Sequence, residues 1–258
     1  LAVAGAGQDA IAELFEQVTT AMAEPWLPEK AVAQAEAETA AGTWRSAAHI
    51  AFVTIDPAGS TDLDQAIQIE RSGTGYRVRY AISDVPAFVA PRGALDRETH
   101  SRATTMYGPD LRVPLHPPVL SVNAASLRPD QERPAFVWTM DLDADGALVD
   151  TTLERAVVRS RAQLDYPGVQ QDLDASGGTG DSLAVLLHEV GRLRTTREIA
   201  RGGVSLGRPE QDVVARDGGW ALEFRAPLPI EGDNAQISLL TGMAAAQLML
   251  AGHIGVLR

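Results

Sequence analysis

The sequence predicts an α/β protein, because a strand-rich stretch is followed by a helical one. Residues 48–158 contain short runs of alternating or continuous apolar residues separated by turn residues, a pattern typical of strands. Residues 160–201 are expected to be helical, and residues 237–250 are apolar on every side, as in a buried helix. The length of 258 residues allows one large domain or two small ones.

The individual elements follow from local patterns. Residues 8–41 are expected to form two helices, because apolar residues recur at helical spacing and Pro25 and Pro28 interrupt them. We therefore expect residues 1–45 to be a helical appendage and residues 46–258 to be the main domain. The other predicted elements are strands at 50–53, 66–70, 76–82, 136–142, 148–158 and within 203–225, turns at 73–75, 143–146, 174–180 and 217–219, and helices from 95, over 160–201 and over 237–250.

Composition excludes several classes of protein. No run of about 18 apolar residues is present, so the sequence predicts no membrane span and no membrane partner. A chain without cysteine forms neither disulfides nor a thiolate zinc site, which fits a cytoplasmic protein. The sequence does not indicate an oligomeric state.

The charge of the chain is unevenly distributed. A formal net charge of −12 argues by itself against non-specific binding of polyanions, which usually needs a basic face. Residues 186–208, however, hold five arginines against two glutamates. A local basic stripe of this kind could still follow a phosphate backbone.

Three aspartates lie close together within residues 54–66. Asp56 is expected at the end of a buried strand, and residues 57–60 have the composition of a turn. Asp62 and Asp64 are expected at the start of the next strand, where residues two apart share a face. Carboxylates crowded in this way repel one another and raise each other's pKa unless a cation relieves the repulsion.

The residues alone leave two interpretations of this segment open. In the first, the carboxylates bind Mg²⁺, which commonly takes a few carboxylates together with phosphate oxygens of a substrate. In the second, the segment is a solvated acidic turn between two strands. A calcium loop does not fit, because the spacing differs from the D-x-[DN]-x-[DN]-G-x₅-E pattern.

The same segment resembles the first signature motif of the ribonuclease II/R family, whose catalytic domain is the RNB domain. That motif opens with Thr-Ile-Asp and closes with an Asp-x-Asp-Asp cluster, and Asp56, Asp62 and Asp64 match three of its four acidic positions. Further segments resemble later motifs of the family in the family's order: 80–85, 95–107, 115–120, 126–133 and 159–170. The resemblance covers roughly residues 48–250.

The resemblance implies an α/β fold with a β-barrel-like core and helices around a channel into which single-stranded RNA is threaded. It implies hydrolysis from the 3′ end, with Mg²⁺ as cofactor and nucleoside 5′-monophosphates as products. On the matching residues, it implies that Asp64 and Asp62 are catalytic and that Asp56, Asp62, Asp64 and Gln65 bind the metal. The implied RNA-binding residues are Tyr107, which would stack on the terminal base, Arg201 and Leu206.

Departures from the family pattern leave other functions open. Gln65 replaces the fourth acid, which should weaken Mg²⁺ binding because an amide oxygen carries no negative charge. Leu206 stands where the family has a stacking Phe, so binding of the terminal base should be weaker. We expect the C-terminal part of the family domain to be absent from this chain. The alternatives are a catalytically impaired RNA-binding or regulatory protein, and a fragment that folds fully only with a missing partner.

Overall fold

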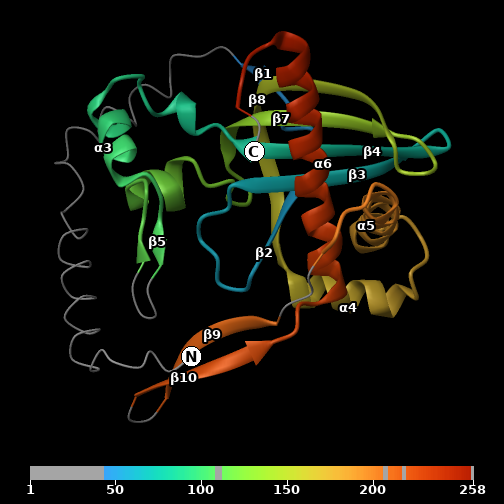
Figure 1. Ribbon diagram of the computed structural model, residues 1–258. Helices are drawn as coiled ribbons and strands as arrows, with labels where there is room; N and C mark the ends of the chain where they lie inside the picture. Colours follow the sequence, from blue (N-terminus) through green and yellow to red (C-terminus); the bar gives the residue numbers. More distant parts are fainter. Residues whose placement is uncertain (1–43, 108–111, 206–208, 217–218, 257–258) are drawn as a thin grey trace. The chain divides into compact units, whose positions relative to one another are not determined.

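The computed structural model describes residues 44–107, 112–205, 209–216 and 219–256 (Figure 1). The helices predicted within residues 8–41 lie outside the described residues, so that prediction stays open. The chain divides into two compact units. Val85–Ala124 belong to the first, whereas Gly42–Asp84 and Ala125–Arg258 form the second, which carries the predicted aspartates.

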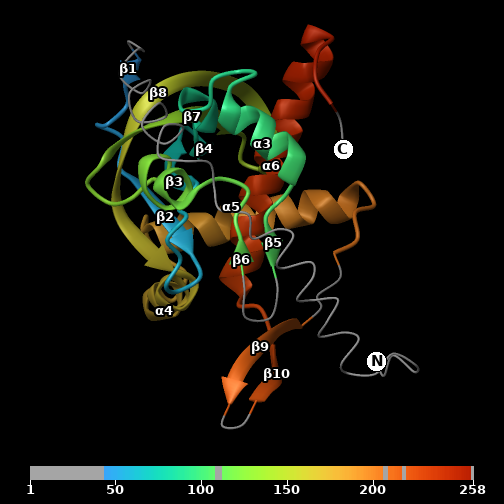
Figure 2. The same cartoon turned by 90° about the vertical axis from the view of Figure 1, so that its left-hand side faces the viewer.

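The second unit is built on a six-stranded mixed sheet that closes on itself. Its order is β1-β8-β2-β3-β4-β7, and the additional pairing of β7 with β8 completes a ring. The strands are β1 (Arg45–Ser46), β2 (Phe52–Asp56), β3 (Gln65–Ser72), β4 (Gly75–Ser83), β7 (Glu132–Leu142) and β8 (Leu148–Asp165). Figure 2 shows the strong curvature of β8, which pairs antiparallel with β7 and then parallel with β2. This closed ring confirms the predicted α/β fold class.

Alternation along the strands separates two cores on the two faces of the sheet. One face carries small residues and a few large ones that fill the space, among them Phe52, Ala81 and Leu127. The other face carries larger side chains, such as Ile67 and Met140, which pack against helices. The ring can close tightly because its first face is built largely from alanine and valine.

Three helices cover the outer face of this sheet. They are α4 (Tyr166–Ser176), α5 (Leu183–Ala200) and α6 (Pro229–Gly252), and the hairpin of β9 (Glu210–Arg216) and β10 (Gly219–Arg225) lies between α5 and α6 in sequence. Side chains cap the first two helices: Asp165 Oδ1 accepts from the Gly168 N–H at 2.8 Å, and Ser182 Oγ accepts from the Val185 N–H at 3.4 Å.

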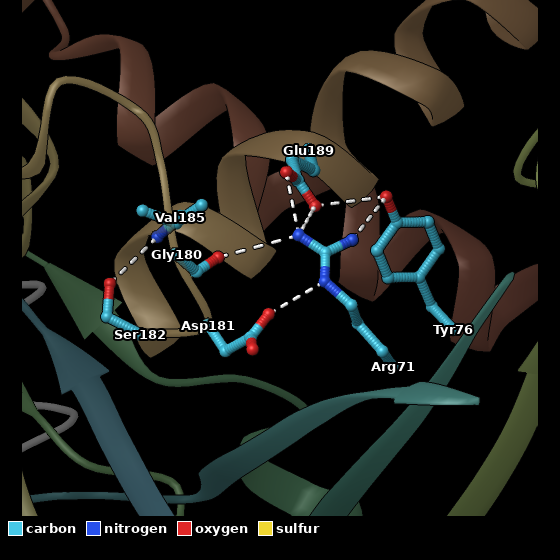
Figure 3. Close-up of polar contacts among 7 residues, drawn as sticks. All are labelled: Arg71, Tyr76, Gly180, Asp181, Ser182, Val185 and Glu189. Atoms are coloured by element: carbon cyan, nitrogen blue, oxygen red, sulfur yellow. Dashed lines mark hydrogen bonds and ion pairs between the residues drawn. The ribbon is translucent and has the colours of Figure 1, made fainter. Parts of the chain in front are cut away.

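A polar network joins the β3–β4 hairpin to α5 (Figure 3). Arg71 Nε donates to Asp181 Oδ1 at 2.7 Å, and Arg71 Nη2 donates to Glu189 Oε1 at 3.0 Å. The Tyr76 hydroxyl donates to Glu189 Oε2 at 3.0 Å. One guanidinium thus fixes the end of the glycine-rich loop that precedes α5. The predicted hairpin turn at 73–75 is confirmed, and the predicted turn at 174–180 is confirmed from residue 177 on, because α4 continues to Ser176.

Two predicted elements differ from the structure. Residues 160–165 were expected to be helical but continue β8, because their backbone pairs with β2 and this tertiary pairing outweighs local preference. The apolar C-terminal helix is not buried on every side. Ile237 and Leu240 are fully buried, whereas Leu239 and Leu250 are 46% and 60% exposed, because only one side of α6 meets the sheet.

The length and composition of α6 also bear on the expectation of no membrane span. Among the described helices, α6 is long and apolar enough to cross a membrane by these two criteria. Its first half packs in the core through Ile230 and Ile237, and a core helix of this kind meets the same criteria.

The first unit consists of short elements. These are η2 (Val85–Ala87), α3 (Ala94–Arg102), the hairpin of β5 (Met106–Tyr107) and β6 (Arg112–Val113), and η3 (Leu120–Ala124). In α3, Arg102 Nε donates to Glu98 Oε1 one turn earlier at 2.8 Å. In the hairpin, Tyr107 pairs with Arg112, whose guanidinium lies 5.7 Å from the centre of the tyrosine ring.

Candidate active site

The predicted aspartates lie on β2 and on the loop that follows it. Asp56 is the last residue of β2, as predicted. Gly59 has a φ of 86°, a conformation that glycine adopts without strain, and it turns the loop back toward β3. Asp62 and Asp64 belong to this loop and not to the strand, because β3 begins at Gln65. The expected location of these two aspartates in the strand was therefore wrong by a few residues.

The loop is anchored at Leu63, which lies between the two aspartates. The Leu63 side chain is 1% exposed, its N–H donates to Ser126 Oγ at 3.0 Å and its carbonyl accepts from the Leu127 N–H at 2.7 Å. Ser126 Oγ also donates to the Thr61 carbonyl at 2.9 Å. Leu63 is buried, whereas Asp62 beside it is half-buried and Asp64 is exposed. This contact gives the segment 126–133 a physical role in positioning the acids.

The negative charges of Asp62 and Asp64 act on Asp56. Burial raises the pKa of Asp56 from 3.8 to about 6, and the negative charges of Asp64 and then Asp62 add to this increase. Asp56 Oδ2 is buried and has no hydrogen-bond partner among the described residues. A buried carboxylate oxygen without a donor, beside two further carboxylates, is electrostatically suited to a cation.

Gln65 lies beside two hydroxyl groups. Its Oε1 atom accepts a hydrogen bond from the Tyr80 hydroxyl on β4, and that hydroxyl lies 3.0 Å from Ser238 Oγ on α6. Burial raises the pKa of Tyr80 to about 12, and the nearby charges of Asp64 and Asp56 contribute to the increase. Tyr80 therefore stays protonated and can donate to an oxygen at position 65.

A second tyrosine borders the same aspartate. Parallel pairing sets Asp56 opposite Asp165, and Tyr166 begins α4 directly after it. The Tyr166 hydroxyl accepts from Asn234 Nδ2 on α6 at 3.2 Å. Burial raises the pKa of Tyr166, and the charge of Asp56 raises it further. Strands β2, β3 and β4 and helices α4 and α6 therefore all contribute to one polar site.

Tyr80, Tyr166, Asn234 and Ser238 are functional candidates that the sequence alone did not reveal. The two tyrosines lie inside segments that resemble family motifs, so those motifs carried a signal for them. Ser238 gives no sequence signal, because it reaches the site only through the packing of α6 on the sheet.

The geometry does not test the metal-binding prediction, but the chemistry of the donor atoms is compatible with it. Within the described part of the chain, no group of three or more His, Cys, Asp or Glu residues is arranged so that it could hold a metal ion. The donor chemistry nevertheless fits Mg²⁺, since it combines the unpartnered oxygen of Asp56 with neighbouring carboxylates and the amide oxygen of Gln65. The assignment of metal ligands stays a prediction.

The predicted RNA-binding residues are distributed over both units. Tyr107 belongs to the first unit and is 74% exposed, so its ring is accessible to a base. Arg201 follows α5 in the second unit and is exposed. Leu206 lies outside the described residues. None of these three assignments is tested by the geometry, and they stay predictions.

Comparison with known proteins adds the family context. Exoribonuclease 2 of Proteus mirabilis is 39% identical over 216 residues, which cover 80% of this chain and 33% of the relative. A protein of Arabidopsis thaliana named inactive exonuclease DIS3L2 is 35% identical over 140 residues, 54% of this chain and 13% of the relative. The chain thus spans a third or less of the length of these relatives.

Solved structures agree on the fold. The structure of Mycoplasma genitalium RNase R with ribose-methylated single-stranded RNA matches with a TM-score of 0.76 and 22% identity, over 95% of this chain and 38% of that protein. The RNB domain model matches residues 45–247, which include every described residue of the candidate active site. The chain therefore belongs to the RNB domain family, the family of ribonuclease II, ribonuclease R and Dis3-type exoribonucleases.

Proposed function

We propose that this chain carries the catalytic residues of a hydrolytic, Mg²⁺-dependent exoribonuclease that degrades single-stranded RNA from its 3′ end. The observation that carries the proposal is the unpartnered, buried Oδ2 atom of Asp56 beside the charges of Asp62 and Asp64. Repulsion among these carboxylates is unfavourable in the protein alone, and a divalent cation would relieve it.

The three aspartates, Gln65 and Tyr80 each have a role in this proposal. Asp56 and Asp62 would hold the ion, and Gln65, which Tyr80 orients, would be a neutral oxygen ligand. When bound, Mg²⁺ would polarise the scissile phosphate and lower the pKa of the attacking water. Asp64 is exposed next to the anchored Leu63, where it can reach the reacting groups and accept a proton from water.

Binding of single-stranded RNA is supported by the fold of the RNase R complex and by the exposure of Tyr107. An exposed aromatic ring can stack on any base, which suits an enzyme that degrades RNA without regard to sequence. Hydrolysis from the 3′ end would release nucleoside 5′-monophosphates one at a time.

Replacement of Asp64 tests the proposal. A 5′-fluorescent oligoadenylate is incubated with Mg²⁺ and the wild-type chain, the Asp64→Asn variant or the Asp172→Asn variant. Asp172 is exposed on α4 outside the site, so its variant controls for the loss of one charge. We expect stepwise shortening and release of adenosine 5′-monophosphate by the wild type and the control, and a rate at least about 100-fold lower for Asp64→Asn. Equal rates for all three proteins would refute the proposal.

The second candidate function is RNA binding without turnover. Gln65 favours it, because the site has one negative charge fewer than the family motif. The name of the inactive relative shows that the family includes proteins without activity. Binding of the oligoadenylate without shortening, at any Mg²⁺ concentration, would support this candidate over the first.

A further inference from the structure

A second concave site lies at the far end of α5 from Ser182. It is a cavity of about 390 Å³ between α5, α6 and the turn from β7 to β8. Neither the three aspartates of the candidate active site nor Gln65 lines it, whereas Arg201, which the resemblance implies in RNA binding, does. Three of its lining residues are arginines of one helical stretch, Arg194, Arg197 and Arg201. Spacings of three and four residues place them on one side of the helix.

Arg194 is the buried member of this group. Its side chain is 3% exposed, and Nη1 donates to the Gly146 carbonyl at 2.9 Å. Nη2 is 3.4 Å from the Met243 sulfur, which is a weak acceptor. Nε is buried and has no hydrogen-bond partner among the described residues. A permanently charged group is thus buried with one donor unsatisfied, which is costly, and a negative charge in the adjoining cavity would offset part of this cost.

Arg197 and Arg201 increase the free-energy cost of burying the charge of Arg194. Burial lowers the pKa of Arg194, and the positive charges of Arg201 and Arg197 lower it further. Across the described residues, the side chains of Arg197 and Arg201 form no hydrogen bond or ion pair, and no acidic residue is among those that line the cavity.

Glu198, an acidic residue that interacts with Arg201, already has hydrogen-bond partners of its own. Glu198 interacts with the charge of Arg201, but its two oxygens accept hydrogen bonds from Ser205 at 3.1 Å and from Gln236 at 2.5 Å. Because these bonds hold the Glu198 carboxylate, it does not enter the cavity to neutralise the arginines.

We propose that this cavity binds an oxyanion of the phosphate class, either free phosphate or the phosphate group of a nucleotide. Three guanidinium groups supply planar, charged donors that match the oxygens of phosphate. The volume of the cavity lies within the range of small-molecule sites, and Leu148, Leu240 and Met243 give it an apolar wall that strengthens the electrostatic attraction. The proposal does not depend on ribonuclease activity.

Calorimetric titration of the intact chain tests this site. The probes are inorganic phosphate, adenosine 5′-monophosphate and adenosine, in a buffer free of phosphate, sulfate and Mg²⁺. We expect both phosphate-bearing probes to bind and adenosine not to bind. Equal affinity for the first two identifies free phosphate as the ligand, whereas tighter binding of the nucleotide identifies a nucleotide site.

The exposed arginines give variants that should fold, whereas replacement of Arg194 would disturb the core. Arg197→Gln and Arg201→Gln are each expected to weaken phosphate binding by about tenfold. This factor corresponds to the lower end of the range for the contribution of one hydrogen bond to a charged group. Arg192→Gln is the matched control, since Arg192 is exposed on the same helix and does not line the cavity. Asp64→Asn should also bind phosphate normally, which separates this site from the candidate active site.

Three results would overturn the proposal. In the first, neither phosphate-bearing probe binds. In the second, phosphate binds, but neither Arg197→Gln nor Arg201→Gln weakens the binding. In the third, acetate raises the unfolding temperature of the protein and phosphate at equal ionic strength does not. The last result would identify the occupant as a protein carboxylate.

Discussion

The Tyr80 hydroxyl donates a hydrogen bond to the Oε1 atom of Gln65 across neighbouring strands of the ring. Tyr80 is buried, and its hydroxyl is also close to Ser238 on α6, so its position is fixed by the sheet and a helix together. The amide of Gln65 is consequently oriented, and the same tyrosine would orient a carboxylate at position 65 in the same way. The site is therefore prepared for an oxygen ligand at this position, even though the residue is neutral.

The first prediction concerns Gln65→Glu, which has nearly the same shape as the wild type and adds one negative charge. We expect the Mg²⁺ concentration for half-maximal activity to fall by roughly tenfold, because ligand charge raises the affinity for a hard cation. Mg²⁺ titration of oligoadenylate shortening measures this. Gln65→Met is the control, and its requirement for Mg²⁺ should rise. If the midpoint is the same in all three proteins, position 65 does not contact the metal.

The second prediction concerns the pH dependence of stability in the absence of Mg²⁺. The pKa of Asp56 is raised in the folded state to about 6, so folding favours its protonated form. The stability that this group contributes is fully present below about pH 4 and is lost as the pH rises through 6. After a discount for solvent screening of a half-buried group, the loss is about 1–2 kcal/mol.

Asp56→Asn removes this titration. Without Mg²⁺, we expect the variant to gain about 1–2 kcal/mol relative to the wild type between pH 4 and pH 7, as measured by urea unfolding. With Mg²⁺ at pH 7, the wild type should be stabilised and the variant should not. A stability difference that does not change with pH would contradict the raised pKa.

The third prediction concerns Tyr107. If its exposed ring stacks on a base, Tyr107→Ala should weaken binding of single-stranded RNA by about 1–3 kcal/mol, and Tyr107→Phe should retain most of the affinity. Fluorescence anisotropy with the Asp64→Asn background, in which the RNA stays intact, measures this. Equal affinities of the alanine and phenylalanine variants would exclude stacking.

The fourth prediction concerns a buried ion pair. Asp84 is fully buried and accepts from Arg155 Nε at 2.7 Å and Nη2 at 2.9 Å. Arg155→Met leaves the carboxylate without this partner, and we expect the free energy of unfolding to fall by about 3 kcal/mol. This value is the lower end of the range for a broken buried ion pair, because the arginine is partly exposed. Arg45→Met is the control, because the exposed Arg45–Glu154 pair should contribute less than about 1 kcal/mol. Urea unfolding at pH 7 compares the two, and equal losses would contradict the prediction.

Local patterns in the sequence predicted the hairpins well. The turn at 143–146 follows from Asp-Ala-Asp-Gly, and Gly146 has a φ of 72° that favours glycine. Asp56 was correctly predicted at a strand end, because a buried apolar run stops directly before it. These features depend on neighbours in sequence, which a single sequence displays.

Features that depend on distant residues were not predictable in the same way. The end of β8 is a strand because β2 lies beside it, roughly a hundred residues earlier in the chain. The partnership of Gln65, Tyr80 and Ser238 requires the packing of α6 on the sheet. The acidic and basic residue counts likewise gave no indication that Arg194 is buried while Arg197 and Arg201 are exposed around one cavity.

The parallel pairing of β2 with β8 has a consequence for biosynthesis. Strand β2 receives its parallel partner only after residues 160–165 have left the ribosome, whereas β3 and β4 can pair at once. Until then one edge of β2 exposes unpaired backbone groups, and such edges promote aggregation. Because this late contact spans so much sequence, ring closure should limit the folding rate. Slower translation before residue 160 should therefore lower the yield of native protein in cells.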